Sequence, residues 1–256
     1  MTKLSVAIIT RNEAANIGRC LDSLKWADEI VVLDGFSTDG TAEVCRKYTE
    51  KIYQKKFESF PVERDHVLRK TSNSWVLSVD ADMYFPPELC AEIRAAVESG
   101  RHDAFLMRGL TVFIGGEIRH CGWFDPTYLR LFNKEKGGYN LKERFLDSFA
   151  PSGSVGKLEN HFIHYGGDDF SEYFGKIRRY SYLTALEYGD KGVRINGANC
   201  AYYFIMKPML IFGYKYIYKM GFLDGVQGLL VCLLSACTYF SAYATLWDQQ
   251  RRGAVA

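Results

Sequence analysis

The chain has 256 residues, of which 48% are hydrophobic, and its formal net charge is +2. This length suits one large domain, or one domain with an appended piece, and the apolar content is that of an ordinary packed core. The small net charge gives no reason to expect a nucleic acid as partner.

The cysteines and the N-terminus indicate a cellular compartment. The seven cysteines include no Cys-x-x-Cys pair and stand mostly among apolar neighbours, which favours buried free thiols in a reducing cytosol over a disulfide framework or a zinc site. The first apolar run, residues 4–9, is too short for a signal peptide and lacks a small-residue cleavage signal. We therefore expect a cytoplasmic catalytic part.

The first hundred residues alternate short β-like runs with helical stretches. This pattern predicts an α/β fold with a largely parallel sheet and crossover helices. The predicted strands cover residues 4–9, 29–33, 52–53 and 75–79. The predicted helices cover residues 13–24, 41–48, 61–71 and 86–97.

Polar residues follow three of these strands, and the carboxyl ends of parallel strands are where open α/β sheets bind ligands. The three clusters are residues 10–13, residues 34–41 and the Asp80-Ala81-Asp82 tripeptide. Because they should converge in space, they predict a cleft of the size of a nucleotide.

Asp80 and Asp82 are the most informative pair. In an extended segment, residues two apart point to the same side, so both carboxylates can face one cation or one diphosphate. Carboxylate oxygens of this kind suit Mg²⁺ or Mn²⁺, which substrate phosphates then help to coordinate. The alternative is structural: Asp80 caps the following helix and Asp82 is solvated.

The composition changes twice in the second half of the chain. Residues 103–131 carry shorter, more aromatic runs with turn signals, and we expect a less regular, acceptor-binding half there. Residues 170–256 are rich in Tyr, Phe and Leu, and basic residues outnumber acidic ones. This predicts a catalytic domain over residues 1–169 and a helical C-terminal region over residues 170–256.

The C-terminal region has features of a membrane-associated segment. Between Asp224 and Asp248 the chain has no charge, which is long enough to cross a bilayer, but its polar residues favour an amphipathic or buried helix over a spanning one. Upstream, aromatic residues alternate with lysines, as in helices that lie on an anionic leaflet. An aromatic core packed within the protein is the alternative.

The motifs resemble those of the family 2 inverting glycosyltransferases of the GT-A fold. The resemblance is carried by Ser5-Val6-Ala7-Ile8-Ile9-Thr10-Arg11-Asn12-Glu13, by Glu29-Ile30-Val31-Val32-Leu33-Asp34-Gly35 with the residues up to Thr41, and by Asp80-Ala81-Asp82. Further segments are similar to those of bacterial lipopolysaccharide-core heptose β-1,4-glucosyltransferases: Tyr128-Leu129-Arg130-Leu131-Phe132, His161-Phe162-Ile163-His164-Tyr165, Lys176-Ile177-Arg178-Arg179-Tyr180-Ser181 and Lys219-Met220-Gly221-Phe222-Leu223-Asp224-Gly225.

The resemblance implies a GT-A fold with a C-terminal helical extension and a metal-dependent, inverting hexosyl transfer. The donor would be a UDP-sugar, most simply UDP-glucose, and the cofactor Mn²⁺ or Mg²⁺. The acceptor would be the lipopolysaccharide core or another lipid-linked glycan, reached from the inner face of the cytoplasmic membrane. Acceptors of other kinds stay open: a polyprenyl phosphate, a capsule glycan or a peptide.

The resemblance also implies roles for single residues. Asp82 and His164 would hold the metal. Asp80 would contact the ribose, with a contact to the metal left open, and Asp34 would contact the uracil. Lining residues of the donor pocket would be Thr10, Arg11, Glu13 and Arg64, and the general base would be Glu143, with Asp147 as the second candidate.

Two positions depart from the subgroup's pattern. Met83 stands where an acidic residue often follows the Asp-x-Asp, and Lys142 stands where a histidine often precedes the glutamate.

Two other classes of function remain for the Asp-x-Asp. A haloacid-dehalogenase-type phosphatase also needs two aspartates at a strand end, but it expects them on the first strand and a threonine where this chain has Tyr84. A membrane adaptor that retains the fold without turnover is the other.

Overall fold

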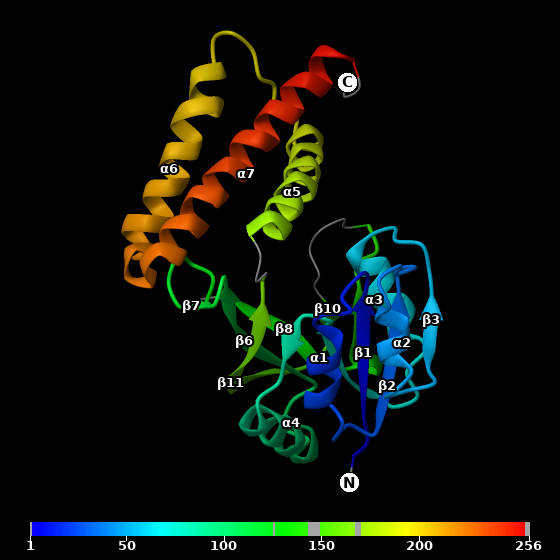
Figure 1. The fold of residues 1–256 in the computed structure, drawn as a ribbon. Coiled ribbons are helices and arrows are strands. Elements are labelled where there is room, and N and C mark those ends of the chain that lie inside the picture. Colours follow the sequence, from blue (N-terminus) through cyan, green and yellow to red (C-terminus); the bar gives the residue numbers. More distant parts are fainter. Residues whose placement is uncertain (1, 125, 143–148, 167–169, 254–256) are drawn as a thin grey trace. The chain divides into compact units, whose positions relative to one another are not determined.

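The computed structural model describes residues 2–124, 126–142, 149–166 and 170–253. The chain folds into two compact units (Figure 1). Unit 1 contains Met1–Leu110 and Pro126–Tyr165, and unit 2 contains Thr111–Asp125 and Gly166–Ala256. The second unit is therefore built from two separate stretches of the sequence.

Unit 1 begins with the predicted alternation of strands and helices. Its first strands are parallel, in the order β3-β2-β1-β4, and are β1 (Leu4–Thr10), β2 (Glu29–Asp34), β3 (Ile52–Gln54) and β4 (Trp75–Asp80). The helices between and after them are α1 (Ile17–Ser23), α2 (Thr41–Cys45), α3 (Phe60–Leu68) and α4 (Pro87–Ser99). The predicted α/β alternation is confirmed.

The first helix starts later than predicted, at Ile17 rather than at Glu13. Residues 13–16 form a turn instead, in which the backbone N–H groups of Asn16 and Ile17 both donate to the carbonyl of Glu13. The periodicity of apolar residues marks the buried face of α1, but it does not mark this turn before it.

The sheet continues beyond β4 with antiparallel strands. β8 (Thr127–Asn133) pairs with β4 and with β6 (Ala104–Phe113), and β11 (Val155–Tyr165) pairs with the short β5 (Met83–Tyr84). The order is β3-β2-β1-β4-β8-β6-β11-β5, with β7 (Gly116–Ile118) on β6. A separate small sheet joins β9 (Gly137–Tyr139), which follows the 3₁₀ turn η1 (Lys134–Lys136), to β10 (Phe149–Pro151).

The centre of the sheet is buried on both faces. Along β1, Leu4, Val6 and Ile8 belong to one core cluster, whereas Ala7 belongs to the cluster on the other face. Successive strand side chains point to opposite faces, so the continuous apolar run of β1 reflects burial on both sides, as in parallel sheets covered by helices.

Unit 2 is mainly helical. It contains α5 (Phe170–Asp190), the π-helical turns η2 (Tyr202–Met206) and η3 (Tyr214–Tyr218) on either side of α6 (Lys207–Gly213), the 3₁₀ turn η4 (Gly221–Asp224) and α7 (Gly225–Arg251). α7 packs against α5 and α6 (Figure 1). Two cores stabilise the unit, one around Val231 and Cys232 and one around Tyr243 and Leu246.

Two further expectations bear on unit 2 and on the cysteines. Within the described ranges, the segment Gly221–Arg251 is the one helical stretch long and apolar enough to cross a membrane. All seven cysteines are free, and those outside Cys200 and Cys237 are buried, which confirms the expected free thiols.

Candidate functional site

The ends of the parallel strands bring the predicted polar clusters together. Thr10 is paired with Asp34 in the register of β1 and β2, and Ile9 is paired with Asp80 in the register of β1 and β4. Thr10, Asp34 and Asp80 thus end three neighbouring strands. The predicted convergence is confirmed by this register.

Asp80 is held between two arginines. Arg64 of α3 contacts Asp80 Oδ1 at 2.5 Å, and Arg130 of β8 contacts Oδ2 at 3.0 Å. Burial alone would raise the pKa of Asp80, but the positive charges of Arg64 and Arg130, with a smaller contribution from His164, hold it at about 2. Asp80 is therefore ionised, and both of its oxygens are already engaged.

Arg64 has further support that fixes its guanidinium. The side chain is 2% exposed, and its Nη1 donates to Ser78 Oγ at 2.8 Å. The Tyr139 hydroxyl donates to the same Ser78 oxygen at 3.3 Å. The prediction placed Arg64 near the donor pocket; the structure places it directly on the first aspartate of the pair.

Asp82 has different surroundings from Asp80. His164 Nε2 lies 3.1 Å from Asp82 Oδ2, because β11 pairs with β5 in a register that sets His164 opposite Met83. The other oxygen, Asp82 Oδ1, is buried and has no hydrogen-bond partner among the described residues. The structure thus brings together the two residues predicted as metal ligands.

A divalent cation fits this pair. An unpartnered buried carboxylate oxygen is costly unless something binds it, and an oxygen beside an imidazole is a suitable start of a Mn²⁺ or Mg²⁺ site. Across the described ranges there is no group of three or more His, Cys, Asp or Glu side chains placed to enclose a metal. Divalent cations of this kind commonly take further ligands from substrate phosphates and water.

The burial of Met83 accounts for an apolar residue at a position where the subgroup often has an acidic one. Its side chain is 3% exposed and belongs to the main core cluster of unit 1. Position 83 therefore points away from Asp82 and into the core.

Asp34 is fully buried at the end of β2. Its oxygens accept hydrogen bonds from Ser37 Oγ at 2.5 Å and from Gln54 Nε2 at 3.0 Å. Ser37 joins this loop to the end of β1, because its Oγ also accepts a hydrogen bond from the backbone N–H of Asn12 at 2.8 Å. A base held by Asp34 would share the carboxylate with these two partners.

The remaining predicted donor residues surround this loop. Thr10 Oγ1 is buried without a hydrogen-bond partner among the described residues, so it can accept or donate to a ligand. The exposed Arg11 lies along Gly35, where a Cβ would come within 3.2 Å of Arg11 Cβ. Glu13 accepts a hydrogen bond from Asn16 at 2.9 Å, which is a role in the turn before α1.

The two candidates for the general base, Glu143 and Asp147, lie outside the described residues. Arg130 lies in one of the segments that carry the family resemblance, which assigns it no role. Its signal is a charged residue between Leu129 and Leu131 in a strand, since a charge in that position needs a buried partner.

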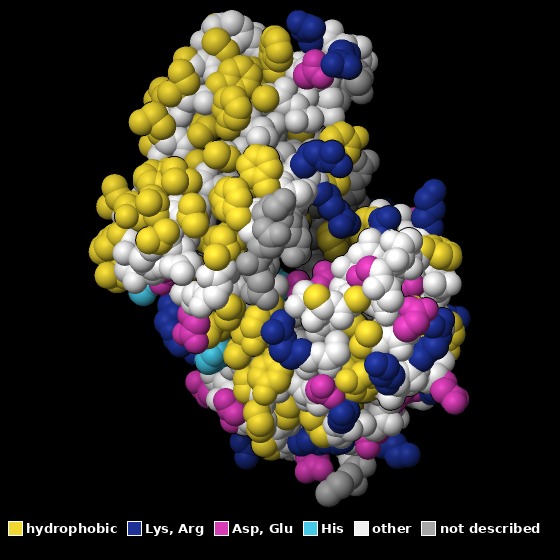
Figure 2. Space-filling model, viewed as in Figure 1, with side chains coloured by type: hydrophobic (Ala, Val, Ile, Leu, Met, Phe, Trp, Pro, Cys, Tyr) yellow, Lys and Arg dark blue, Asp and Glu magenta, His cyan; other side chains and the backbone are white. Residues whose placement is uncertain are grey.

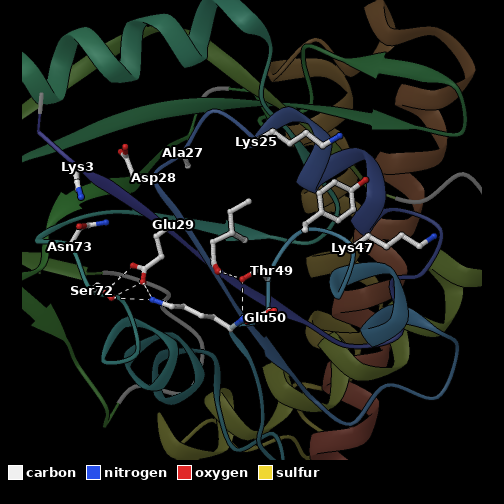
Figure 3. A pocket seen from close by; sticks show the side chains of 13 residues that line it. Lys3, Lys25, Ala27, Asp28, Glu29, Lys47, Thr49, Glu50, Ser72 and Asn73 are labelled. Atoms are coloured by element: carbon white, nitrogen blue, oxygen red, sulfur yellow. Dashed lines mark hydrogen bonds and ion pairs between the residues drawn. The ribbon is translucent and has the colours of Figure 1, made fainter.

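A separate open hollow of about 690 Å³ lies at the other end of these strands (Figure 3). It is lined by Lys3, Asp28, Glu29, Lys51 and Ser72 among others. Glu29 begins β2, whereas Asp34 ends it, so this hollow is distinct from the candidate site. Its central carboxylate is already bonded to Lys51 and Ser72.

Comparisons with known proteins point in one direction. The model of glycosyl transferase family 2 matches residues 5–150. A lipopolysaccharide core biosynthesis glycosyltransferase, LpsC of Rhizobium meliloti, is 27% identical over 94% of this chain and 93% of its own length. An uncharacterized glycosyltransferase of Rickettsia felis is 26% identical over 96% of this chain and 90% of its own.

Among solved structures, a mannosyltransferase from Pyrobaculum calidifontis in complex with GDP-Man and Mn²⁺ superimposes with a TM-score of 0.56 at 16% identity. The match covers 96% of this chain and 88% of that one. At this identity the likeness concerns the fold.

Proposed function

The chain belongs to glycosyl transferase family 2 and has the predicted GT-A fold with a C-terminal helical extension, and from this premise we propose a specific reaction. The protein moves a hexose, most simply glucose, from a UDP-sugar to a lipopolysaccharide-core or other lipid-linked glycan. The transfer inverts the anomeric centre and depends on Mn²⁺ or Mg²⁺. The enzyme works in the cytoplasm, peripherally on the membrane.

The observation that supports this proposal best is the asymmetry of the Asp80 and Asp82 pair. Asp80 is neutralised by two arginines, while Asp82 Oδ1 is buried without a described partner and His164 stands on the opposite oxygen. A phosphatase of the haloacid-dehalogenase type expects both aspartates on its first strand, whereas here Asp80 ends β4, the fourth strand, and Asp82 comes after it. Family membership and this placement set the phosphatase aside.

The chain's own groups have separable tasks. Asp82 and His164 would hold the cation, which when bound neutralises charge on the departing diphosphate. Arg64 and Arg130 keep Asp80 ionised and fixed, so that its carboxylate can accept hydrogen bonds from the ribose hydroxyls. Thr10 and Asp34 would bind the nucleoside end, and Glu143 would take the proton of the acceptor hydroxyl.

The acceptor is inferred from a relative and from unit 2. The Rhizobium meliloti relative is named for lipopolysaccharide core biosynthesis, and the similarity extends over the helical region as well. A lipid-linked acceptor requires an enzyme that reaches the membrane surface, and unit 2 has the composition for this contact.

Donor-induced thermal stabilisation tests the proposal. With Mn²⁺, UDP-glucose at about 100 times its Kd stabilises the native state by about 2.7 kcal/mol, and the melting temperature rises accordingly. Asp82→Ala removes the Mn²⁺-dependent part of this rise. Glu98→Ala, which removes an exposed carboxylate of α4, leaves it unchanged.

The same assay identifies the donor. We expect UDP-glucose to stabilise the protein more than GDP-mannose does; the reverse order would replace the proposed donor. If no nucleotide sugar stabilises the protein with Mn²⁺, the proposed function is wrong. Hydrolysis of phosphate monoesters would instead support the phosphatase.

A further inference from the structure

Unit 2 carries a large apolar surface along the run of residues 202–226, which we call the α6 face. It includes Ile205, Met209, Ile217, Tyr218, Leu223 and Val226, and the most exposed of these are Met209 and Ile217 at 68%, Val226 at 69% and Tyr218 at 73%. Figure 2 shows hydrophobic side chains gathered over α6 in this view. Single exposed apolar side chains are common on soluble proteins, but a continuous patch marks a contact surface.

The exposed positions recur with a helical spacing. Ile205, Met209 and Ile217 stand four and eight residues apart on the run formed by η2, α6 and η3. On the other side of the same run, Phe204 and Phe212 pack against the two cores of unit 2. The run is therefore apolar on both sides, and the unit's own core uses only one of them.

The charges beside the α6 face are positive. The charged residues of this run are Lys207, Lys215, Lys219 and Asp224. Lys215 Nζ turns inward and donates to the carbonyl of Cys121 at 3.3 Å, so Lys207 and Lys219 are the lysines that remain beside the face. The Asp224 side chain is 4% exposed and turns inward, where its carboxylate pairs with His120 Nδ1 at 2.7 Å and accepts from the His120 backbone at 2.8 Å. Lys207 Nζ lies 5.8 Å from the Tyr202 ring centroid. Lysines among aromatic and aliphatic side chains complement an anionic lipid surface.

The dimensions favour a helix that lies on the membrane over one that crosses it. At 1.5 Å per residue, η2, α6 and η3 together span about 25 Å, less than the roughly 30 Å of a bilayer core, and Lys207 and Lys215 interrupt them. The longer α7 has Val231, Tyr243 and Leu246 buried within unit 2, so those side chains are not available to lipid.

We propose that the α6 face docks unit 2 onto an anionic membrane surface, with the run from Tyr202 to Tyr218 lying in the plane of the interface and its apolar side chains inserted between the lipids. The docking itself follows from the exposed side chains. Its purpose, to reach a lipid-linked acceptor, rests on the proposed function.

Flotation of the full chain with lipid vesicles tests the docking. We expect binding to vesicles of phosphatidylcholine with phosphatidylglycerol to exceed binding to phosphatidylcholine alone by about tenfold or more. The double variant Met209→Glu, Ile217→Glu should lose at least about tenfold in binding. The control Val155→Glu changes an exposed apolar residue of β11 in unit 1 and should bind as the unaltered chain does.

Several outcomes would overturn the docking. They are failure of the unaltered chain to bind either kind of vesicle, and undiminished binding by the double variant. A dimer in sedimentation velocity that the double variant dissociates would make the α6 face an interface between two copies. Retention after an alkaline carbonate wash would make α7 a spanning helix.

The double variant also separates docking from the proposed function. It should keep the donor-induced rise in melting temperature with Mn²⁺, because every described residue assigned to donor binding lies in unit 1, and this rise also shows that the variant is folded. If the unaltered chain docks on vesicles but no nucleotide sugar stabilises it, the proposed function fails and the docking stands.

Discussion

At the residue scale, Asp80 and Asp82 stand one position apart but differ in what neutralises them. Asp80 has a guanidinium on each oxygen, whereas Asp82 has an imidazole on one oxygen and no described hydrogen-bond partner on the other. The arginines hold the Asp80 carboxylate in place, and each of its oxygens keeps a lone pair for a ribose hydroxyl. The unpartnered buried oxygen of Asp82 suits a cation instead, so the two aspartates have separate roles.

Removing Arg130 should destabilise the fold at neutral pH. We expect Arg130→Met to cost about 2 kcal/mol of unfolding free energy at pH 7, because it takes one charged hydrogen bond from a partly buried carboxylate that retains Arg64. Urea unfolding measures this cost. Arg46→Met, which breaks an exposed pair with Glu43, is the matched control and should change stability by less than about 0.5 kcal/mol.

The cost of Arg130→Met should depend on pH. Because the pKa of Asp80 is about 2 in the fold and about 3.9 when unfolded, its ionisation stabilises the protein above pH 4, and this contribution disappears as the pH falls toward 2. Arg130→Met raises that pKa, so its cost should shrink in the same window. If the loss of unfolding free energy in Arg130→Met did not change between pH 4 and pH 2, the ion pair between Arg130 and Asp80 would be contradicted.

The hydrogen bonds of Glu29 lead to a second prediction about stability and pH. Its side chain is 7% exposed. Burial would raise its pKa, but hydrogen bonds from Lys51, Ser5 and Ser72 lower the pKa to about 2; Figure 3 shows the bonds between Ser72 and Glu29. Glu29→Gln should therefore cost about 2 kcal/mol at pH 7, and progressively less as the pH falls from about 4.5 to 2. Urea unfolding at several pH values measures it, with the exposed Glu43→Gln as control. Equal costs at pH 7 and pH 3 would refute the assignment.

At the scale of elements, local patterns predicted the parallel half of the fold well. The strands β1, β2 and β4 and the cluster that ends each of them follow from apolar runs and polar breaks. The antiparallel half was less accessible, because contacts such as His164 with Asp82 and Arg130 with Asp80 depend on strand pairing over 82 and 50 residues of sequence. Only the resemblance to a family drew attention to His164, and nothing assigned Arg130.

The close packing of β6 against β11 leaves no room for a side chain at Gly109. A Cβ at Gly109 of β6 would lie 2.5 Å from two ring carbons of Phe162, and Phe162 cannot readily move because it stacks on Phe85 at 5.9 Å. Gly109→Ala should cost about 1–3 kcal/mol, as measured by urea unfolding. Gly138→Ala, where no atom lies within 4 Å of the added Cβ, should stay within about 0.5 kcal/mol. Similar costs for both variants would contradict this packing.

At the scale of the whole molecule, the candidate donor site and the α6 face lie in different units. Thr10, Asp34, Arg64, Asp82 and His164 all belong to unit 1, and so does Arg130. The α6 face belongs to unit 2. Residues 111–125, which include the end of β6, belong to unit 2 although residues of unit 1 flank them on both sides in the sequence. The end of unit 1 therefore cannot be read as one boundary in the sequence.

This division predicts how a truncated chain behaves. A chain of residues 1–166 retains the described donor-site residues but exposes Phe113, Ile118 and Cys121, whose core partners Val231 and Cys232 lie in the deleted helix. We expect it to bind the dye ANS and to aggregate, because a patch that is buried in the intact protein becomes exposed. Adding Phe113→Ser and Ile118→Ser should restore solubility.

Donor binding by the truncated chain decides whether unit 1 is sufficient for the site. With both serine substitutions, residues 1–166 should keep the Mn²⁺-dependent rise in melting temperature with UDP-glucose, since the described residues assigned to the donor are all present. The same substitutions in the full chain should instead destabilise it by about 3 kcal/mol or more, because there they place hydroxyls in a closed core. A soluble truncated chain that shows no donor response, beside a full chain that responds, would place an essential part of the donor site in unit 2.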